Sequence, residues 1–79
     1  MWVKSQNNKM LLNVTSFSLE KNYGSKKKMA IVGITGTANI LNTNAKVLGL
    51  YTTEAEALSE LTNIEEHLDK ASKVVYHLN

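Results

Sequence analysis

The chain has 79 residues, of which 43% are hydrophobic and 20% charged, with a formal net charge of +2. This length predicts a single domain over residues 1–79, and the composition is typical of a folded globular protein. The chain contains no cysteine, and its two histidines lack the thiolate or closely spaced second imidazole of a zinc site, so neither disulfides nor metal support the small core. Self-association is the support that we expect instead.

The N-terminal sequence MWVKSQNNKM lacks the apolar stretch of about 7–15 residues that signal peptides contain. No segment approaches the roughly 20 apolar residues of a membrane span. The absence of cysteine agrees with a reducing compartment. These features predict a cytoplasmic protein with no membrane partner.

The first half of the chain predicts strands joined by polar turns. Residues 1–6 alternate like a strand with one exposed face, and residues 7–9 form a turn. After Leu12 and Val14 the apolar phase shifts to Phe17 and Leu19, which predicts a bulge or bend at 15–16. Residues 21–28 form the next turn.

Residues 29–34 form a continuous apolar run that indicates a central strand, and residues 46–51 form the next strand. In the turn at 21–28, Asn22 and Gly24 are suited to positive φ. Gly36 indicates a bend, residues 42–44 a hairpin turn, and residues 37–41 an extra short strand. Gly49 permits a close approach by another segment.

The glutamates after Tyr51 begin a helix. Thr53 and Glu56 have the spacing of a capping box, and acidic residues suit the positive end of the helix dipole. The apolar positions then recur at helical spacing up to an end near residues 71–72, and they are Ala57, Leu58, Leu61, Ile64, Leu68 and Ala71. Residues 73–78 return to a strand pattern.

Together these segments predict an α+β fold in the order β-β-β-β-α-β. An antiparallel sheet of four to six strands packs one face against the single helix of the C-terminal half.

Three groups of residues are candidates for a catalytic, metal-binding or cofactor-binding site. Glu60 with Glu56 or Glu54 could pair as carboxylates, but we place them on the solvated side of the helix. His67 and His77 lack a serine or a carboxylate at a catalytic spacing. The glycines at 33–36 match neither a phosphate loop nor a dinucleotide-binding motif. We therefore expect no catalytic residue, cofactor or metal, and no enzymatic activity.

The lysines predict one possible binding surface. Residues 1–50 contain seven lysines and one glutamate (net +6), and residues 51–79 contain two lysines and six acids (net −4). The run Lys26, Lys27, Lys28, aided by Lys9 and Lys46, could contact phosphates. The chain has no arginine, and Tyr23 is the only aromatic residue near the run, so a solvated turn is the favoured interpretation.

A second possible surface is apolar. Trp2, Phe17 and Leu19 are out of phase with Val3, Leu12 and Val14, which predicts a patch on the sheet face away from the helix. A two-fold dimer could bury this patch and set the lysine turns near Glu60, Glu65 and Glu66 of the other copy. In the alternative, segment 36–46 covers the face of a monomer.

The stretches MWVKSQNNKMLLNV, LGLYTTEAEALSEL and VVYHLN resemble a group of short proteins of Gram-positive bacteria and their phages. Members begin with an aromatic or aliphatic residue, a basic residue and Ser-Gln, and carry Leu-Gly-x-Tyr before a capped helix. The resemblance spans both ends of the chain and implies an antiparallel sheet with one helix, without an assigned activity. Segment 36–46 is longer than the matching hairpin of the group.

The favoured function is a non-enzymatic protein-interaction module that forms a homodimer and binds another macromolecule. The alternative is a weak nucleic-acid-binding accessory protein that uses the turn at Lys26–Lys28.

Overall fold

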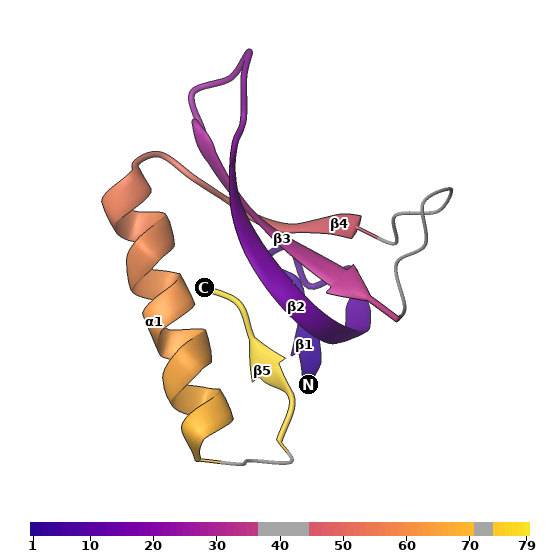
Figure 1. Cartoon of the computed structure of the whole chain (residues 1–79). Coiled ribbons are helices and arrows are strands. Elements are labelled where there is room, and N and C mark those ends of the chain that lie inside the picture. Colours follow the sequence, from indigo (N-terminus) through magenta and orange to yellow (C-terminus); the bar gives the residue numbers. More distant parts are fainter. Residues whose placement is uncertain (37–44, 71–73) are drawn as a thin grey trace.

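The computed structural model describes residues 1–36, 45–70 and 74–79, and it has the predicted α+β fold (Figure 1). Its elements are β1 (Trp2–Lys4), β2 (Leu11–Lys21), β3 (Met29–Thr35), β4 (Ala45–Tyr51), α1 (Glu54–Asp69) and β5 (Tyr76–His77). The order β-β-β-β-α-β is confirmed. The predicted strand at 37–41 and the turn at 42–44 lie outside the described residues, and α1 ends at Asp69 with its C-cap at Lys70, earlier than the predicted end near 71–72.

The five strands form one sheet in the order β4-β3-β2-β1-β5, and α1 packs on one face of it. Neighbours from β1 to β4 are antiparallel, whereas β5 runs parallel to β1, so the sheet is mixed rather than wholly antiparallel. Because β5 follows a helix, no hairpin forces it to run antiparallel to its neighbour. The pairing continues past β5, where Leu78 N donates to Lys4 O at 3.0 Å.

The predicted bulge in β2 is confirmed, because the register against β3 shifts between Val14 and Ser16. Its consequence differs from our prediction. Beyond the bulge, Leu19 stands opposite the fully buried Ile31, and Phe17 packs against both clusters of the core. The extra residue of the bulge restores the phase, so the apolar side chains on either side of it face the helix.

The helix begins at the predicted cap. Thr53 Oγ1 accepts a hydrogen bond from Glu56 N at 3.2 Å and donates one to Glu56 Oε1, also at 3.2 Å. The carboxylate thus contacts the threonine hydroxyl, where a capping box predicts a contact to the threonine N–H. Thr53 has extended backbone angles, as an N-cap residue requires.

The buried face of α1 is rotated from the predicted one. Ala57 and Ile64 are buried as predicted, but Leu58 is 47% exposed and Leu68 is also exposed. Glu60 is buried in their place, with 3% of its surface exposed. The prediction for Leu58 and Leu68 was wrong because the sheet covers only a narrow stripe of the helix.

The sheet curls until the chain after β1 meets β4. Gln6 N donates to Leu48 O at 2.8 Å, which connects the two segments. Leu48 and Leu78 belong to one core cluster with side chains from β1, β2 and α1. Gly49 permits the close approach that we predicted, since a Cβ atom there would lie 2.9 Å from Leu78 Cδ2.

Candidate functional site

The predicted patch of Trp2, Phe17 and Leu19 is not formed. Phe17 and Leu19 are half-buried against the core, whereas Trp2 is 51% exposed on the opposite face of the sheet. On that outer face the diagonal neighbour of Trp2 is Leu11, which is 55% exposed. The structure therefore replaces the predicted patch with Trp2 and Leu11.

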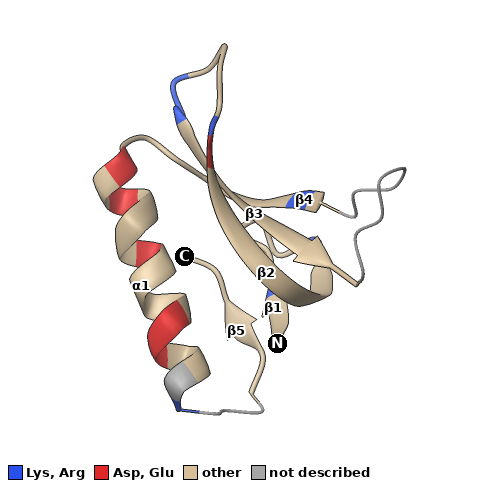
Figure 2. Ribbon diagram, in the orientation of Figure 1, with Lys and Arg blue, Asp and Glu red and all other residues tan. Residues whose placement is uncertain are grey.

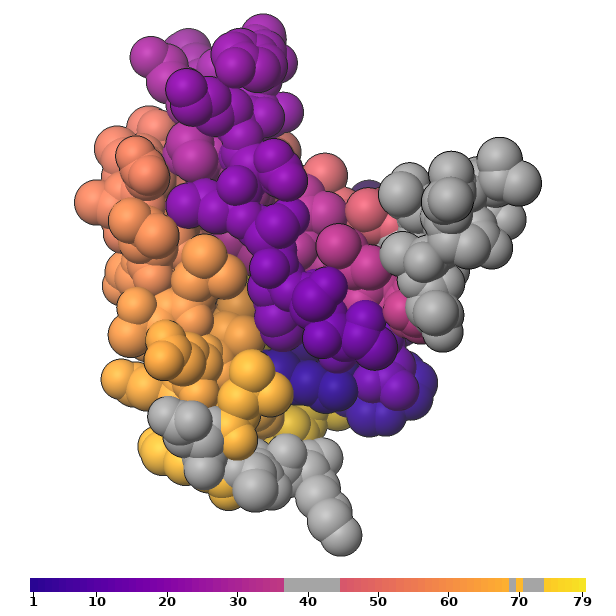
Figure 3. All heavy atoms as spheres, in the orientation of Figure 1, coloured from indigo at the N-terminus to yellow at the C-terminus, as the bar shows by residue number. Residues whose placement is uncertain are grey.

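The lysine run lies at the tip of the β2–β3 hairpin, which projects from the body of the molecule (Figures 2 and 3). Asn22 holds this turn together, since Asn22 N donates to Lys28 O at 2.7 Å and its side-chain amide donates to Lys27 O at 2.7 Å. Of the two residues suited to positive φ, Gly24 adopts it, with φ at 86°, and Asn22 does not.

The five lysines of the predicted nucleic-acid surface do not come together. Lys46 stands opposite Gly33, whereas the other end of β4, at Tyr51, stands opposite Met29 beside the hairpin tip. Five residues of strand, about 17 Å, therefore separate Lys46 from the tip. Lys9 lies in the turn after β1. Within its own turn the lysine run has Tyr23, which is 84% exposed, as an aromatic neighbour.

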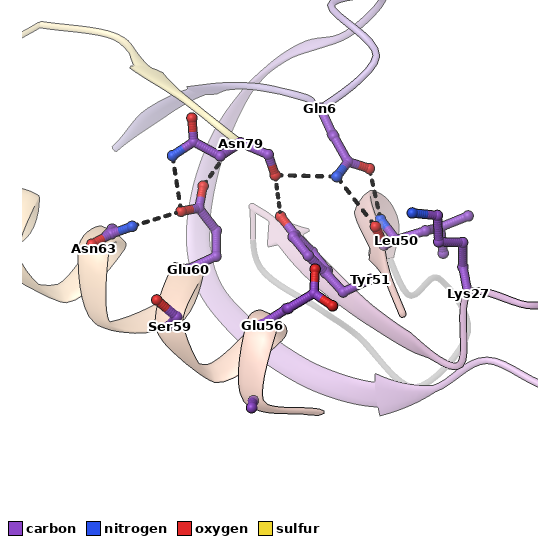
Figure 4. Close-up of a pocket in the computed structure, with 10 residues that line it drawn as sticks. Gln6, Lys27, Leu50, Tyr51, Glu56, Ser59, Glu60, Asn63 and Asn79 are labelled. Atoms are coloured by element: carbon purple, nitrogen blue, oxygen red, sulfur yellow. Dashed lines mark hydrogen bonds between the residues drawn. The ribbon is translucent and has the colours of Figure 1, made fainter. Parts of the chain in front are cut away.

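A groove of about 520 Å³ lies between the end of β4 and the first half of α1 (Figure 4). It draws residues from both ends of the chain and from the β2–β3 turn. The lining residues are Gln6, Lys27, Leu50, Tyr51, Ala55, Glu56, Ser59, Glu60, Asn63 and Asn79.

Glu60 is the buried acid of this groove, which corrects our placement of it on the solvated side of the helix. Its Oε2 accepts from Asn79 N at 2.6 Å, and its Oε1 accepts from Asn79 Nδ2 at 3.2 Å and from Asn63 Nδ2 at 3.0 Å. A buried carboxylate is tolerated only where such donors replace its water. Glu60 therefore anchors the last residue of the described chain to α1 (Figure 4).

Tyr51 holds the same residue from the sheet, because its hydroxyl donates to Asn79 O at 2.8 Å. Burial, reinforced by the nearby charge of Glu60, raises the pKa of Tyr51 above its ordinary value. The pKa of Tyr76 is raised by the same two causes and by a hydrogen bond to Glu60. Both phenols therefore remain protonated hydrogen-bond donors at neutral pH.

Gln6 occupies the edge of β4. Its Oε1 accepts from Leu50 N at 2.9 Å, and its Nε2 donates to Leu50 O at 3.2 Å. The same Nε2 donates to Asn79 O at 3.1 Å. The side-chain amide thus makes with Leu50 the pair of bonds that a residue of an adjacent strand makes with its backbone.

The other acids weighed as a carboxylate pair lie outside the buried part of the groove, and His67 has a structural contact. Glu54 and Glu56 are exposed in the first turn of α1. His67 Nε2 lies 2.9 Å from Val74 O, and its ring meets that of Tyr76 edge to face with centroids 5.2 Å apart. His67 therefore joins the end of α1 to the β5 segment.

No group of three or more histidine, cysteine or acidic side chains is arranged to hold a metal ion in residues 1–36, 45–70 and 74–79. Within the same ranges, no helix has the length and apolarity needed to span a membrane.

The sequence could have revealed part of the groove. Glu60 follows Ala57 by three residues and precedes Ile64 by four, so helical spacing alone puts it on the buried face. Gln6, Tyr51 and Asn79 offered no such signal, since 44 positions separate Gln6 from Leu50 and 28 separate Tyr51 from Asn79.

The groove holds a residue of the chain itself. Its hydrogen bonds converge on the backbone and side chain of one residue, Asn79, through a carboxylate, a phenol and an amide. Lys27, Ser59 and Glu56, whose carboxylate accepts a hydrogen bond from the Thr53 hydroxyl, line the rest of its walls. Comparison with models of known protein families found no match, and comparisons with curated proteins and with solved structures found none either.

Proposed function

We propose that the protein is a non-enzymatic protein-interaction module that forms a homodimer through the outer face of its sheet. The observation that carries this proposal is the exposure of Trp2 and Leu11 as diagonal neighbours on that face. Diagonal neighbours lie about 7–8 Å apart, within reach of an aromatic side chain, so the two form one apolar surface. Exposed aromatic side chains are typical of interface centres.

Val47 is a further exposed apolar side chain on the outer face of the sheet. It is half exposed and stands opposite Val32, which lies on the outer face because its neighbour Ile31 points into the core. A second copy is the favoured occupant because the chain has 79 residues and no cysteine. Burial of apolar surface between two copies adds the stability that so small a core lacks.

The groove supports the non-enzymatic part of the proposal. Its buried acid and its three side-chain amides, those of Gln6, Asn63 and Asn79, are engaged in hydrogen bonds with one another and with the chain backbone. Catalytic side chains need polar atoms that are free to contact a substrate. A catalytic nucleophile also needs a base within hydrogen-bonding reach. The groove instead holds a segment of chain in place.

Sedimentation equilibrium tests the dimer. The wild-type protein is expected to have twice the monomer mass of 8.8 kDa at micromolar concentration. Leu11→Lys is expected to give the monomer mass. The matched control is Leu58→Lys, which adds the same charge at an equally exposed leucine on the helix and leaves the dimer intact. A wild-type mass of 8.8 kDa that persists to about 100 μM would refute the proposal.

One observation favours the second candidate, a nucleic-acid-binding accessory protein. The exposed ring of Tyr23 stands in the same projecting turn as Lys26, Lys27 and Lys28, so a base could stack beside phosphate contacts. The salt dependence of binding tests this candidate.

A further inference from the structure

The edge of β4 has an unusual partner. β4 is the terminal strand of the sheet, and such a strand presents backbone N–H and C=O groups that attract another strand. The chain after β1 already covers part of this edge: Gln6 N donates to Leu48 O, and at Leu50 both groups are paired by the Gln6 side-chain amide. In an antiparallel pair the N–H and C=O of one residue make the same two bonds, so one residue of a peptide could take the place of the Gln6 amide.

The groove beside this edge has room for such a peptide. One wall is the edge of β4 at Leu50 and Tyr51, and the other is the first half of α1 from Ala55 to Asn63. Peptide-binding domains of several kinds add an extended segment between a strand edge and a helix in this way. The volume of about 520 Å³ is within the range of sites that hold small ligands or a few residues.

The structure already contains one residue bound there. Asn79 lies in the groove with its N–H on Glu60 and its carbonyl oxygen on Tyr51 and Gln6. Every polar group of its backbone is thus engaged by groove residues. The site is therefore built to hold polypeptide backbone as well as side chains.

We propose that this groove binds an extended segment of a partner protein, which pairs with the backbone of Leu50 in place of the Gln6 amide. Lys27 and Glu56, both exposed on the groove lining, favour a segment that carries both an acidic and a basic side chain. This surface is separate from the outer sheet face of Trp2 and Leu11. The proposal thus goes beyond the homodimer and does not depend on it.

In this arrangement Gln6 closes the site. A partner must first displace the Gln6 side-chain amide from Leu50. The affinity for a partner is therefore reduced by the strength of the two hydrogen bonds that this amide makes with Leu50. Removal of the Gln6 side chain is therefore expected to tighten peptide binding about tenfold.

A fluorescein-labelled peptide, acetyl-Thr-Val-Lys-Val-Glu-Thr-amide, serves as the probe, with fluorescence anisotropy for affinity and ¹⁵N NMR for location. The wild-type protein is expected to bind it weakly, with shifts of the Leu48 and Leu50 amide signals, and Gln6→Ala about tenfold more tightly. Leu11→Lys, altered only on the outer sheet face, is expected to bind it like the wild type. This variant separates failure of the groove from failure of the dimer.

A second peptide keeps the test decisive even if Gln6→Ala does not fold. It has the same sequence with N-methyl groups on the two valine amides, which removes their donors without changing charge. Strand pairing at Leu50 requires these donors, so the wild-type protein is expected to lose the Leu50 shift with this peptide. Equal binding of both peptides, or no shift of Leu50 with the unmodified peptide up to about 1 mM, would overturn the proposal.

Discussion

The carboxylate of Glu60 accepts a hydrogen bond from the backbone N–H of Asn79 at 2.6 Å, across 19 positions of sequence. This bond ties the segment that follows β5 to the helix, while Tyr51 ties the same residue to the sheet. Sheet, helix and the last described residue are thereby joined at one end of the groove.

Replacement of Glu60 should destabilise the fold. Glu60→Gln retains one acceptor but sets an amide donor against the donors of Asn79 and Asn63, so the free energy of unfolding should fall by about 1–3 kcal/mol. Urea denaturation measures the change. Glu65→Gln is the matched control at an exposed position of the same helix, and it should change stability by less than about 0.5 kcal/mol. Equal stability of the two variants would show that the Glu60 contacts are not formed.

The helix cap makes a separate contribution. Thr53→Ala removes the hydroxyl that accepts from Glu56 N, and the expected loss is about 0.5–2 kcal/mol. Thr52→Ala, at the exposed neighbouring threonine, is the control. Thermal unfolding compares the two, and an unchanged melting temperature in Thr53→Ala would argue against the cap.

The orientation of α1 can be tested with two apolar truncations. Ile64→Ala creates a cavity at a buried position, with an expected cost of about 2–5 kcal/mol. Leu68→Ala removes a side chain that is already exposed, and its cost should stay within about 0.5 kcal/mol. A larger loss for Leu68→Ala than for Ile64→Ala, measured by chemical denaturation, would mean that the helix presents the other face.

The two raised tyrosine pKa values predict how stability depends on alkaline pH. In the folded protein burial raises the pKa of Tyr51 and Tyr76 above the ordinary tyrosine value of 10.0, so the folded state retains protons that the unfolded state has lost. Stability should therefore be constant below about pH 10 and decrease as the pH rises above it.

Urea denaturation at a series of pH values from about 8 to 11 measures this dependence. Tyr51→Phe should weaken the alkaline decrease, because one of the two titrating groups is gone. Tyr23→Phe, at the exposed hairpin tyrosine, should leave it unchanged. An alkaline decrease of the same size in Tyr51→Phe would contradict the assignment.

Salt dependence decides the nucleic-acid alternative. A single-stranded DNA bound through the three lysines of the hairpin tip should give a slope near −2 in a plot of log affinity against log salt, at about −0.7 for each phosphate contact. Replacement of Lys26, Lys27 and Lys28 by glutamine should flatten that slope. If the wild-type protein shows no binding to DNA or RNA at about 50 mM salt, the alternative is excluded.

The sequence by itself determined the features that depend on neighbours along the chain. The cap at Thr53, the bulge at 15–16 and the order of strands and helix follow from spacings of two to four residues, and all three are present in the structure. Local backbone geometry sets these spacings, so they can be inferred without knowledge of the fold. The spacing of Glu60 to Ala57 and Ile64 is also consistent with its burial, but our prediction placed Glu60 on the solvated side and was wrong.

Only the tertiary structure decided which faces meet. The side of the sheet that Phe17 and Leu19 occupy depends on how the bulge is paired with β3, and the parallel direction of β5 depends on where the helix returns the chain. The groove depends on contacts such as that between Gln6 and Leu50, 44 positions apart. Such contacts form only after the sheet has curled and α1 has packed on it, because a long-range hydrogen bond depends on the relative placement of whole elements. Residues that meet in this way leave no periodic signal in the sequence.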